Sequence, residues 1–249
     1  MPSSVRILDV DVDAVTLAEA VDAIGDAVDA CRGHGGSTFQ VATVNPQFVI
    51  LARGDRAFRD ILRGAALRVP DGVGVVQASW ILGRPLPGRV PGVELVQSLA
   101  ASSARRGHRL FLLGAAPGVA EAVATRLLRH SPGLTVAGTF AGDASEAGDA
   151  ESLGRIREAR ADILLVAYGA PAQERWLARN LVVSGAAAGI GVGGTFDYLA
   201  GRVQRAPAVM RRLGLEWLFR VVRQPWRIGR IAQLPLFLLL VIRQRLRGT

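Results

Sequence analysis

The segment Asp162–Val192, DILLVAYGAPAQERWLARNLVVSGAAAGIGV, indicates the fold class. It contains an apolar strand over Asp162–Ala167, a helix over Pro171–Val182 and a second apolar strand over Ala186–Val192. Strands without alternating polar residues are buried on both faces, as parallel strands are when helices cover each side of the sheet. The segment is therefore expected to form a strand–helix–strand unit of a parallel sheet.

The same rhythm of helices and strands extends toward the N-terminus. Before Asp162 the pattern predicts three helices and, between them, two strands: helices over Leu95–Arg106, Gly118–His130 and Glu151–Ala159, strands over Arg109–Leu113 and Leu134–Thr139. Earlier still we expect an extended segment over Val5–Val12 and strands over Thr38–Thr43 and Ala66–Val69. Helices are expected to start at Thr16, Asn45 and Val73. The predicted fold class is α/β and Rossmann-like, with a largely parallel sheet flanked by helices.

Basic residues concentrate at the C-terminal end of the chain. All 30 basic residues are arginines, and residues 202–249 hold eleven of them with a single acid, a net charge of +10, whereas residues 1–201 carry −1. We therefore expect an α/β domain over residues 1–201 and a basic, amphipathic, helical appendage over residues 202–249. This charge suits an anionic partner, either a lipid surface or a nucleic acid.

The appendage also carries an apolar stretch. Its longest apolar run, Leu234–Ile242, has nine residues, whereas a membrane-spanning helix needs about 20. Arginines alternate with leucines and aromatic residues around it, which favours a helix lying on a membrane. A helix packed on the core or against a second copy is the alternative. Because residues 1–13 lack the basic and apolar regions of a secretory signal, we expect a cytoplasmic protein, peripheral on the inner face of the cell membrane.

Polar residues and glycines follow the predicted strands directly. Ligands of such sheets bind at the carboxyl ends of the strands, so these positions are expected to share one rim: Thr43, Asp71, Gly114, Tyr168, Gly169 and Gly191–Gly194. Asp71 is the first candidate, because a carboxylate in a turn kept open by Gly72 and Gly74 is placed to act as a general base. The alternative is that Asp71 caps the helix that follows.

Other rim residues suit a polar, phosphate-bearing ligand. Thr43 and Asn45 offer a hydroxyl and an amide, although Asn45 also suits the N-cap of the helix that follows it. Gln173 and Glu174 open a helix, where free N–H groups favour an anion. Gln173 is the expected ligand contact, and Glu174 alternatively balances the helix dipole.

A glycine cluster at Gly189–Gly194 follows the last predicted strand. Its glycines, Gly193 among them, allow the backbone to approach a ligand closely. Asp197, shortly after, either binds substrate or caps its turn. The cluster reads GIGVGG and matches the dinucleotide-binding fingerprint poorly, so a dehydrogenase is disfavoured.

Several multi-residue blocks occur in a defined order and spacing. They are TVNPQFVILA at Thr43–Ala52, VPDGVGVV at Val69–Val76, AYGAPAQERWL at Ala167–Leu177 and the stretch Gly191–Arg220. Together they resemble the WecG/TagA/CpsF family of glycosyltransferases, over nearly the whole chain. The sequence departs from the family pattern at Ala172, where a lysine is usual.

The resemblance implies roles for individual residues. Asp71 is then the proposed base, and Thr43 and Asn45 contact the substrate. Arg89 resembles the arginine that the family assigns to the donor diphosphate. The appendage is expected to close over the site, where three of its arginines clasp a diphosphate: Arg220, Arg227 and Arg230.

No metal or cofactor is predicted. Asp9–Asp13 contains a DXD string, which chelates a divalent metal in other glycosyltransferases. Here its alternation favours an edge strand with the acids on the exposed face. The three histidines and one cysteine show no ligand spacing. The charge of a leaving group would then be met by arginines and helix N-termini.

The resemblance implies an inverting enzyme that moves a hexose or N-acetylhexosamine, such as N-acetylmannosamine, from a UDP-sugar to a polyprenyl-diphosphate-linked sugar. Its product would be a precursor of a bacterial cell-surface polysaccharide. A nucleic-acid-binding module using the basic tail is one alternative, disfavoured by the leucine run. A nucleotide-binding scaffold without catalysis is another. The sequence leaves open whether the protein is a homo-oligomer.

Overall fold

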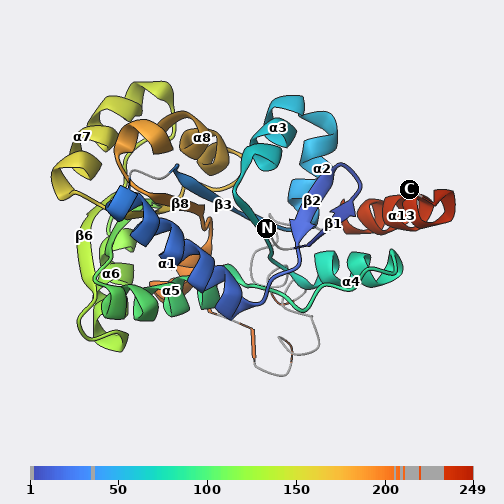
Figure 1. The fold of residues 1–249 in the computed structure, drawn as a ribbon, viewed down its shortest axis with the longest axis horizontal. Helices are drawn as coiled ribbons and strands as arrows, with labels where there is room; N and C mark the ends of the chain where they lie inside the picture. Colours follow the sequence, from blue (N-terminus) through green and yellow to red (C-terminus); the bar gives the residue numbers. More distant parts are fainter. Residues whose placement is uncertain are drawn as a thin grey trace.

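The structure is a computed structural model that describes residues 3–34, 37–204, 206–207, 210, 219 and 233–248. At its centre lies a six-stranded sheet in which every neighbouring pair is parallel (Figure 1). From one edge to the other the strands are β4 (Leu67–Pro70), β3 (Phe39–Val44), β8 (Ala188–Gly191), β7 (Ile163–Ala167), β5 (Arg109–Gly114) and β6 (Thr135–Phe140). The predicted parallel α/β sheet is confirmed.

The inner strands are apolar on both faces because each face meets a separate core. In β5, Leu110 and Leu112 enter one core, and Phe111 and Leu113 enter the other. The strand β7 divides its side chains in the same way. This packing explains why these strands show no polar alternation in the sequence.

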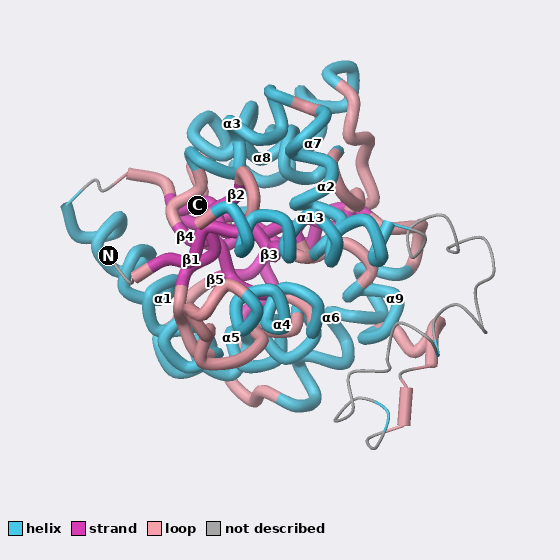
Figure 2. Tube along the Cα trace, turned by 90° about the vertical axis from the view of Figure 1, so that its right-hand side faces the viewer, coloured by secondary structure: helices cyan, strands magenta, loops and turns pink. Residues whose placement is uncertain are grey.

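Helices form a layer on each face of the sheet (Figures 1 and 2). One layer consists of α1 (Leu17–His34), α5 (Gly92–Arg106), α6 (Val119–His130) and α9 (Thr195–Leu199). The other contains α3 (Arg56–Gly64), α7 (Asp149–Ala159) and α8 (Ala172–Ser184), with the short 3-10 turn Glu146–Gly148 before α7. A further core forms beside β3 and β4, where α2 (Pro46–Gly54) and α4 (Val73–Ile81) pack.

The N-terminal segment differs from the expected single extended element over Val5–Val12. It forms a hairpin of β1 (Ser4–Ile7) and β2 (Val10–Asp13), with Leu8 at a φ of 54° in the turn. The expectation that the acids lie on the exposed face is wrong for Asp13. This side chain is buried and pairs with Arg68 at 2.9 Å, because the hairpin packs against β4.

Two short helices, α3 and α9, are absent from the sequence prediction. The start of α3 is hidden because Asp55 both ends α2 and begins α3. Its N–H donates to the carbonyl of Leu51 at 3.0 Å, and its Oδ1 accepts the N–H of Phe58 at 2.9 Å. A junction of one residue leaves no loop for a sequence pattern to reveal.

The described part of the appendage is chiefly α13 (Gln233–Arg247), which lies across the end of the molecule against α2 and α4 (Figure 2). Phe237 and Val241 are fully buried there. Gln244 Oε1 accepts the N–H of Leu8 at 2.8 Å, and its Nε2 donates to the carbonyl of Arg6 at 3.1 Å. One face of α13 thus packs on the core. No helix within the described ranges is long and apolar enough to cross a bilayer.

Candidate active site

The ends of β3 and β4 bring the first two sequence blocks together. The N–H of Asp71 donates to the carbonyl of Val44 at 2.8 Å, which continues the sheet ladder and holds Asp71, half-buried, at the rim. Gly72 is the N-cap of α4 and has a φ of 116°. A Cβ on Gly74 would lie 2.7 Å from Cγ of Pro46, so only glycine permits this contact. The helices that follow both strands therefore begin side by side.

Asn45 caps α2, as the residue pattern predicts. Its Oδ1 accepts the N–H of Phe48 at 3.2 Å, and Pro46 occupies the first turn. A Cβ built on Gly72 would lie 4.0 Å from Cβ of Asn45, so Asn45 also neighbours the turn that carries Asp71. The capping role is confirmed, and Asn45 is at the rim as well.

Thr43 is buried, with 5% of its surface exposed. Its hydroxyl donates to the carbonyl of Gly191 at 2.9 Å, which ties β3 to β8. The hydroxyl that suggested a substrate contact is therefore engaged between two strands. Its position beside Gly191 still places it directly beneath the rim.

Gln173 and Glu174 form a buried unit beneath the loops that follow β7 and β8. Gln173 is 2% exposed, and its Oε1 accepts the N–H of Gly169 at 3.0 Å and that of Gly193 at 2.9 Å. Its Nε2 donates to Oε1 of Glu174 at 2.7 Å. A Cβ on Gly191 would lie 2.6 Å from Nε2 of Gln173. The Gln173 amide thus fixes two glycine turns of the rim.

The ends of β5 and β7 also approach closely. Gly114 has a φ of 98°, and a Cβ there would lie 2.8 Å from the carbonyl carbon of Ala167. Tyr168, the next residue, packs edge-on against Trp176 with ring centroids 6.2 Å apart. Its hydroxyl abuts Gly142, and burial raises the pKa of Tyr168 to about 12. The Tyr168 side chain belongs to the core beneath α7 and α8, and Gly169 stays at the rim.

Arg89 lies on a loop tethered to the same rim. The N–H of Val90 donates to the carbonyl of Pro70 at 2.7 Å, so Arg89 is adjacent to the strand end that carries Asp71. Two residues further, a Cβ on Gly92 would lie 2.7 Å from Oγ1 of Thr195. This contact joins the start of α5 to α9, which carries the half-buried Asp197.

The rim therefore combines a carboxylate, an arginine and the N-terminal ends of α2, α4 and α8. Helix N-termini favour negative charge, and arginine binds phosphate oxygens with paired hydrogen bonds. A carboxylate beside them is placed to take a proton from a hydroxyl. This set of groups suits a reaction in which a hydroxyl attacks and a phosphate leaves.

Comparison with known proteins identifies the family. The sequence model of the glycosyl transferase WecG/TagA/CpsF family matches residues 5–249. The chain belongs to this family. It is therefore a glycosyltransferase by family, which favours sugar transfer over the nucleic-acid-binding alternative.

Two relatives of the family are similar over most of their length, and both are named N-acetylglucosaminyldiphosphoundecaprenol N-acetyl-beta-D-mannosaminyltransferase. The protein of Bacillus subtilis (strain 168) is 32% identical over 204 residues, which are 82% of this chain and 79% of that protein. The protein of Staphylococcus aureus (strain MW2) is 31% identical over 236 residues, which are 95% of this chain and 91% of that protein.

Three arginines that the family resemblance assigns to a diphosphate lie outside the described residues: Arg220, Arg227 and Arg230. Of the other candidates, the structure gathers Asn45, Asp71, Gly72 and Arg89 at the β3–β4 part of the rim. Residue-type reasoning named Gly74 only for the turn at Asp71, and it missed the close contacts that Gly74 and Gly92 make possible. Their signal is a glycine in the first turn of the helix that follows each block.

Glu174 is a fully buried acid in the sequence block Ala167–Leu177. Burial raises the pKa of Glu174 to about 7, and its Oε2 has no hydrogen-bond partner among the described residues. In the unfolded chain the pKa is near its ordinary value of 4.5, so the folded protein holds the proton more tightly. Folding stability contributed by the protonated form is then lost as the pH rises from about 4.5 through 7.

We expect the substitution Glu174→Gln to remove this pH dependence. It keeps an acceptor for Nε2 of Gln173 and carries no charge at any pH. At pH 8 the variant should be more stable than the wild type by about 3 kcal/mol, since one pKa unit corresponds to about 1.4 kcal/mol. Urea unfolding at pH 5 and pH 8 measures the effect, with Glu158→Gln, an exposed acid on α7, as the control. An unchanged pH slope in Glu174→Gln would contradict the assignment.

Proposed function

We propose that the protein transfers N-acetylmannosamine, or a related hexose, from a UDP-sugar to a polyprenyl-diphosphate-linked sugar, with inversion at the anomeric carbon. The observation that carries this proposal is Asp71, held half-buried at the rim beside the Arg89 loop in a member of a glycosyltransferase family. The names of the two relatives support both the sugar and the diphosphate-linked acceptor.

Asp71 acts as the base in the proposed reaction. The acceptor hydroxyl oxygen attacks the anomeric carbon and gives its proton to the Asp71 carboxylate. The bond between that carbon and the phosphate oxygen breaks, and UDP leaves with the bonding electrons. Asn45 and the backbone of the Gly169 and Gly193 turns border the sugar. Thr43 and Gln173 hold these groups in place through their hydrogen bonds to Gly191, Gly169 and Gly193.

Positive groups of the rim stabilise the leaving diphosphate. Arg89 and the N-terminal ends of α4 and α8 supply fixed positive charge where negative charge develops. In this proposal the appendage adds Arg220, Arg227 and Arg230, and the reaction requires no metal ion. Transfer should then persist in the presence of EDTA.

A transfer assay tests the proposed function. UDP-sugars are screened with a short-chain diphosphate-linked N-acetylglucosamine acceptor, with and without EDTA, and the product linkage is read by NMR. We expect transfer of N-acetylmannosamine with inverted configuration. Binding of UDP without transfer to any acceptor would favour the non-catalytic scaffold, and loss of transfer in EDTA would contradict metal independence.

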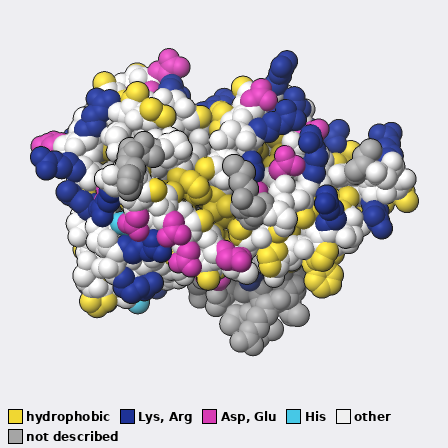
Figure 3. All heavy atoms as spheres, in the orientation of Figure 1, with side chains coloured by type: hydrophobic (Ala, Val, Ile, Leu, Met, Phe, Trp, Pro, Cys, Tyr) yellow, Lys and Arg dark blue, Asp and Glu magenta, His cyan; other side chains and the backbone are white. Residues whose placement is uncertain are grey.

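We also propose that α13 docks the protein on an anionic membrane at the inner face of the cell membrane. Of the eight exposed large apolar side chains in the described ranges, five lie on α4 and α13. On α13, Leu239 and Leu246 point outward, and Arg243 and Arg247 are exposed beside them. Figure 3 shows arginine side chains gathered at the end of the molecule where α13 lies. Leucines that enter a lipid layer beside arginines are typical of interfacial helices.

Vesicle cosedimentation tests this docking. The double variant Leu239→Glu and Leu246→Glu should bind vesicles that contain anionic phospholipid at least about 10-fold more weakly, since burying one leucine contributes roughly 1.5–3 kcal/mol. Val182→Glu, which alters an exposed apolar residue on α8, is the matched control and should bind normally. Equal binding of the double variant and the wild type would contradict docking through α13.

A further inference from the structure

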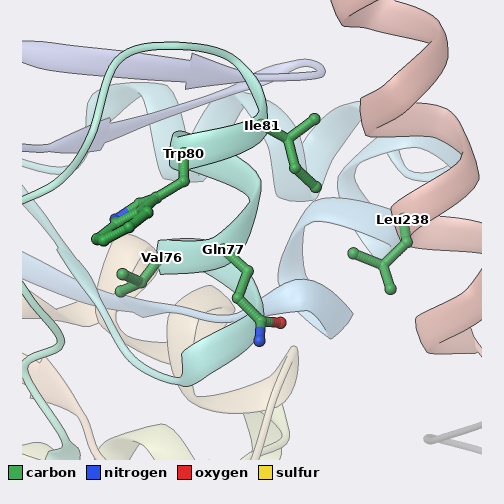
Figure 4. A pocket seen from close by; sticks show the side chains of 5 residues that line it. All are labelled: Val76, Gln77, Trp80, Ile81 and Leu238. Carbon is green, nitrogen blue, oxygen red and sulfur yellow. The ribbon is translucent and has the colours of Figure 1, made fainter.

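An apolar groove runs along α4 and reaches α13. It has a volume of about 460 Å³ and is lined by Val76, Gln77, Trp80 and Ile81 of α4 and by Leu238 of α13 (Figure 4). Four of its five lining residues are apolar, and Trp80 is 68% exposed. Apolar surface of this kind that faces water marks a site for an apolar ligand.

Contacts within the described chain fix α13 against α4 and the core. Nη1 of Arg245 donates to the carbonyl of Leu82 at 3.4 Å, just beyond the end of α4. Phe237 and Val241 are buried on the core side of α13. The spacing between the two helices is therefore set by packing on the core.

The groove lies along the helix that starts at the candidate base. Asp71 comes two residues before α4, and Val76 is in the first turn of that helix. The lining positions Val76, Gln77, Trp80 and Ile81 follow the i, i+1, i+4, i+5 spacing of one helix face. A molecule whose sugar lies at Asp71 can therefore place an apolar chain along α4.

We propose that this groove receives the first isoprenoid units of the polyprenyl acceptor, an inference that rests on the proposed function. The acceptor sugar lies at Asp71, its diphosphate lies near Arg89 at the rim, and its chain continues along α4. The position of the surface favours the acceptor's own chain over the bilayer, because most of its lining residues lie on the helix that starts two residues after Asp71. The outward leucines of α13, by contrast, are placed to meet the lipid surface.

Acceptors that differ only in their apolar chain test the proposal. N-acetylglucosamine diphosphate carrying a farnesyl group is compared with the same compound carrying a methyl group, without vesicles and below the concentration at which micelles form. For the wild type, KM for the farnesyl acceptor should be at least 10-fold lower. Trp80→Ala and Gln77→Glu should raise that KM about 10-fold and leave kcat and the KM of the methyl acceptor unchanged. Val182→Ser is the matched control, and calorimetric binding of the farnesyl acceptor gives a readout that needs no turnover.

The outcomes separate the groove from the proposed function. Binding of the farnesyl compound that weakens in Trp80→Ala, without any sugar transfer by the wild type, would support the groove and contradict the function. Efficient transfer with equal KM values for both acceptors would support the function and contradict the groove. Loss of vesicle binding in Trp80→Ala, with an unchanged farnesyl KM, would assign the surface to the bilayer and overturn the proposal.

Discussion

Asp71→Asn is expected to lower kcat at least ~100-fold, because a positioned base contributes about 10²- to 10⁴-fold to such a reaction. The amide has nearly the shape of the carboxylate but accepts no proton. The backbone bond from Asp71 to Val44 does not involve the side chain, so the rim should keep its geometry. Binding of UDP, measured by calorimetry, should therefore be nearly unchanged.

The control for this substitution is Asp143→Asn. Asp143 is an exposed carboxylate after β6, at the opposite edge of the sheet from β4. Its replacement should leave kcat within about twofold of the wild type. Near-normal turnover in Asp71→Asn would remove Asp71 from the role of base, whatever its effect on UDP binding.

Gln173→Leu is expected to lower the free energy of unfolding by about 3 kcal/mol and to lower kcat as well. The substitution leaves the half-buried N–H groups of Gly169 and Gly193 without their acceptor, and an unsatisfied donor costs about 1–3 kcal/mol, with the lower values for groups that water still reaches. It also removes the donor to Glu174. Two turns of the rim would then lose the contact that fixes them.

Urea unfolding and steady-state kinetics measure these two effects. Gln97→Leu, on an exposed position of α5, makes the same chemical change away from the rim and should alter neither quantity. If Gln173→Leu is as stable as the wild type, the bonds of Gln173 to the two glycine turns do not carry the stability assigned to them. If it is destabilised but turns over normally, Gln173 does not position the site.

The sequence predicts most of the sheet because its strands are apolar on both faces and are separated by helices of ordinary length. The prediction fails where the local residues carry no signal of the structure that they form. Asp55 ends α2 and begins α3, so the junction has no loop composition. Leu8 turns the hairpin with a φ of 54°, a conformation for which leucine has no preference. Tertiary packing, rather than local propensity, decides both.

The candidate site was predictable in outline from residues that follow strands, but the partners of those residues were not. The hydroxyl of Thr43 and the amide of Gln173 have the chemistry of ligand contacts, yet each bonds a backbone group of a distant segment. The separation in sequence between Thr43 and Gly191 hides this contact from any local pattern. Asn45, by contrast, bonds within three residues, and its cap was predictable.

The packing of α13 against the N-terminal hairpin affects how the proposed lipid binding should be studied. Because Gln244 bonds to Arg6 and Leu8, and Phe237 lies in the same core as the first hairpin, deleting residues 202–249 would remove part of that core together with the helix proposed to dock on lipid. A truncated protein that no longer sediments with vesicles would therefore confound unfolding with detachment. Changing only the outward side chains of α13 separates unfolding from loss of lipid binding, since the packing of Phe237 in the core and the bonds of Gln244 to the N-terminal hairpin stay in place.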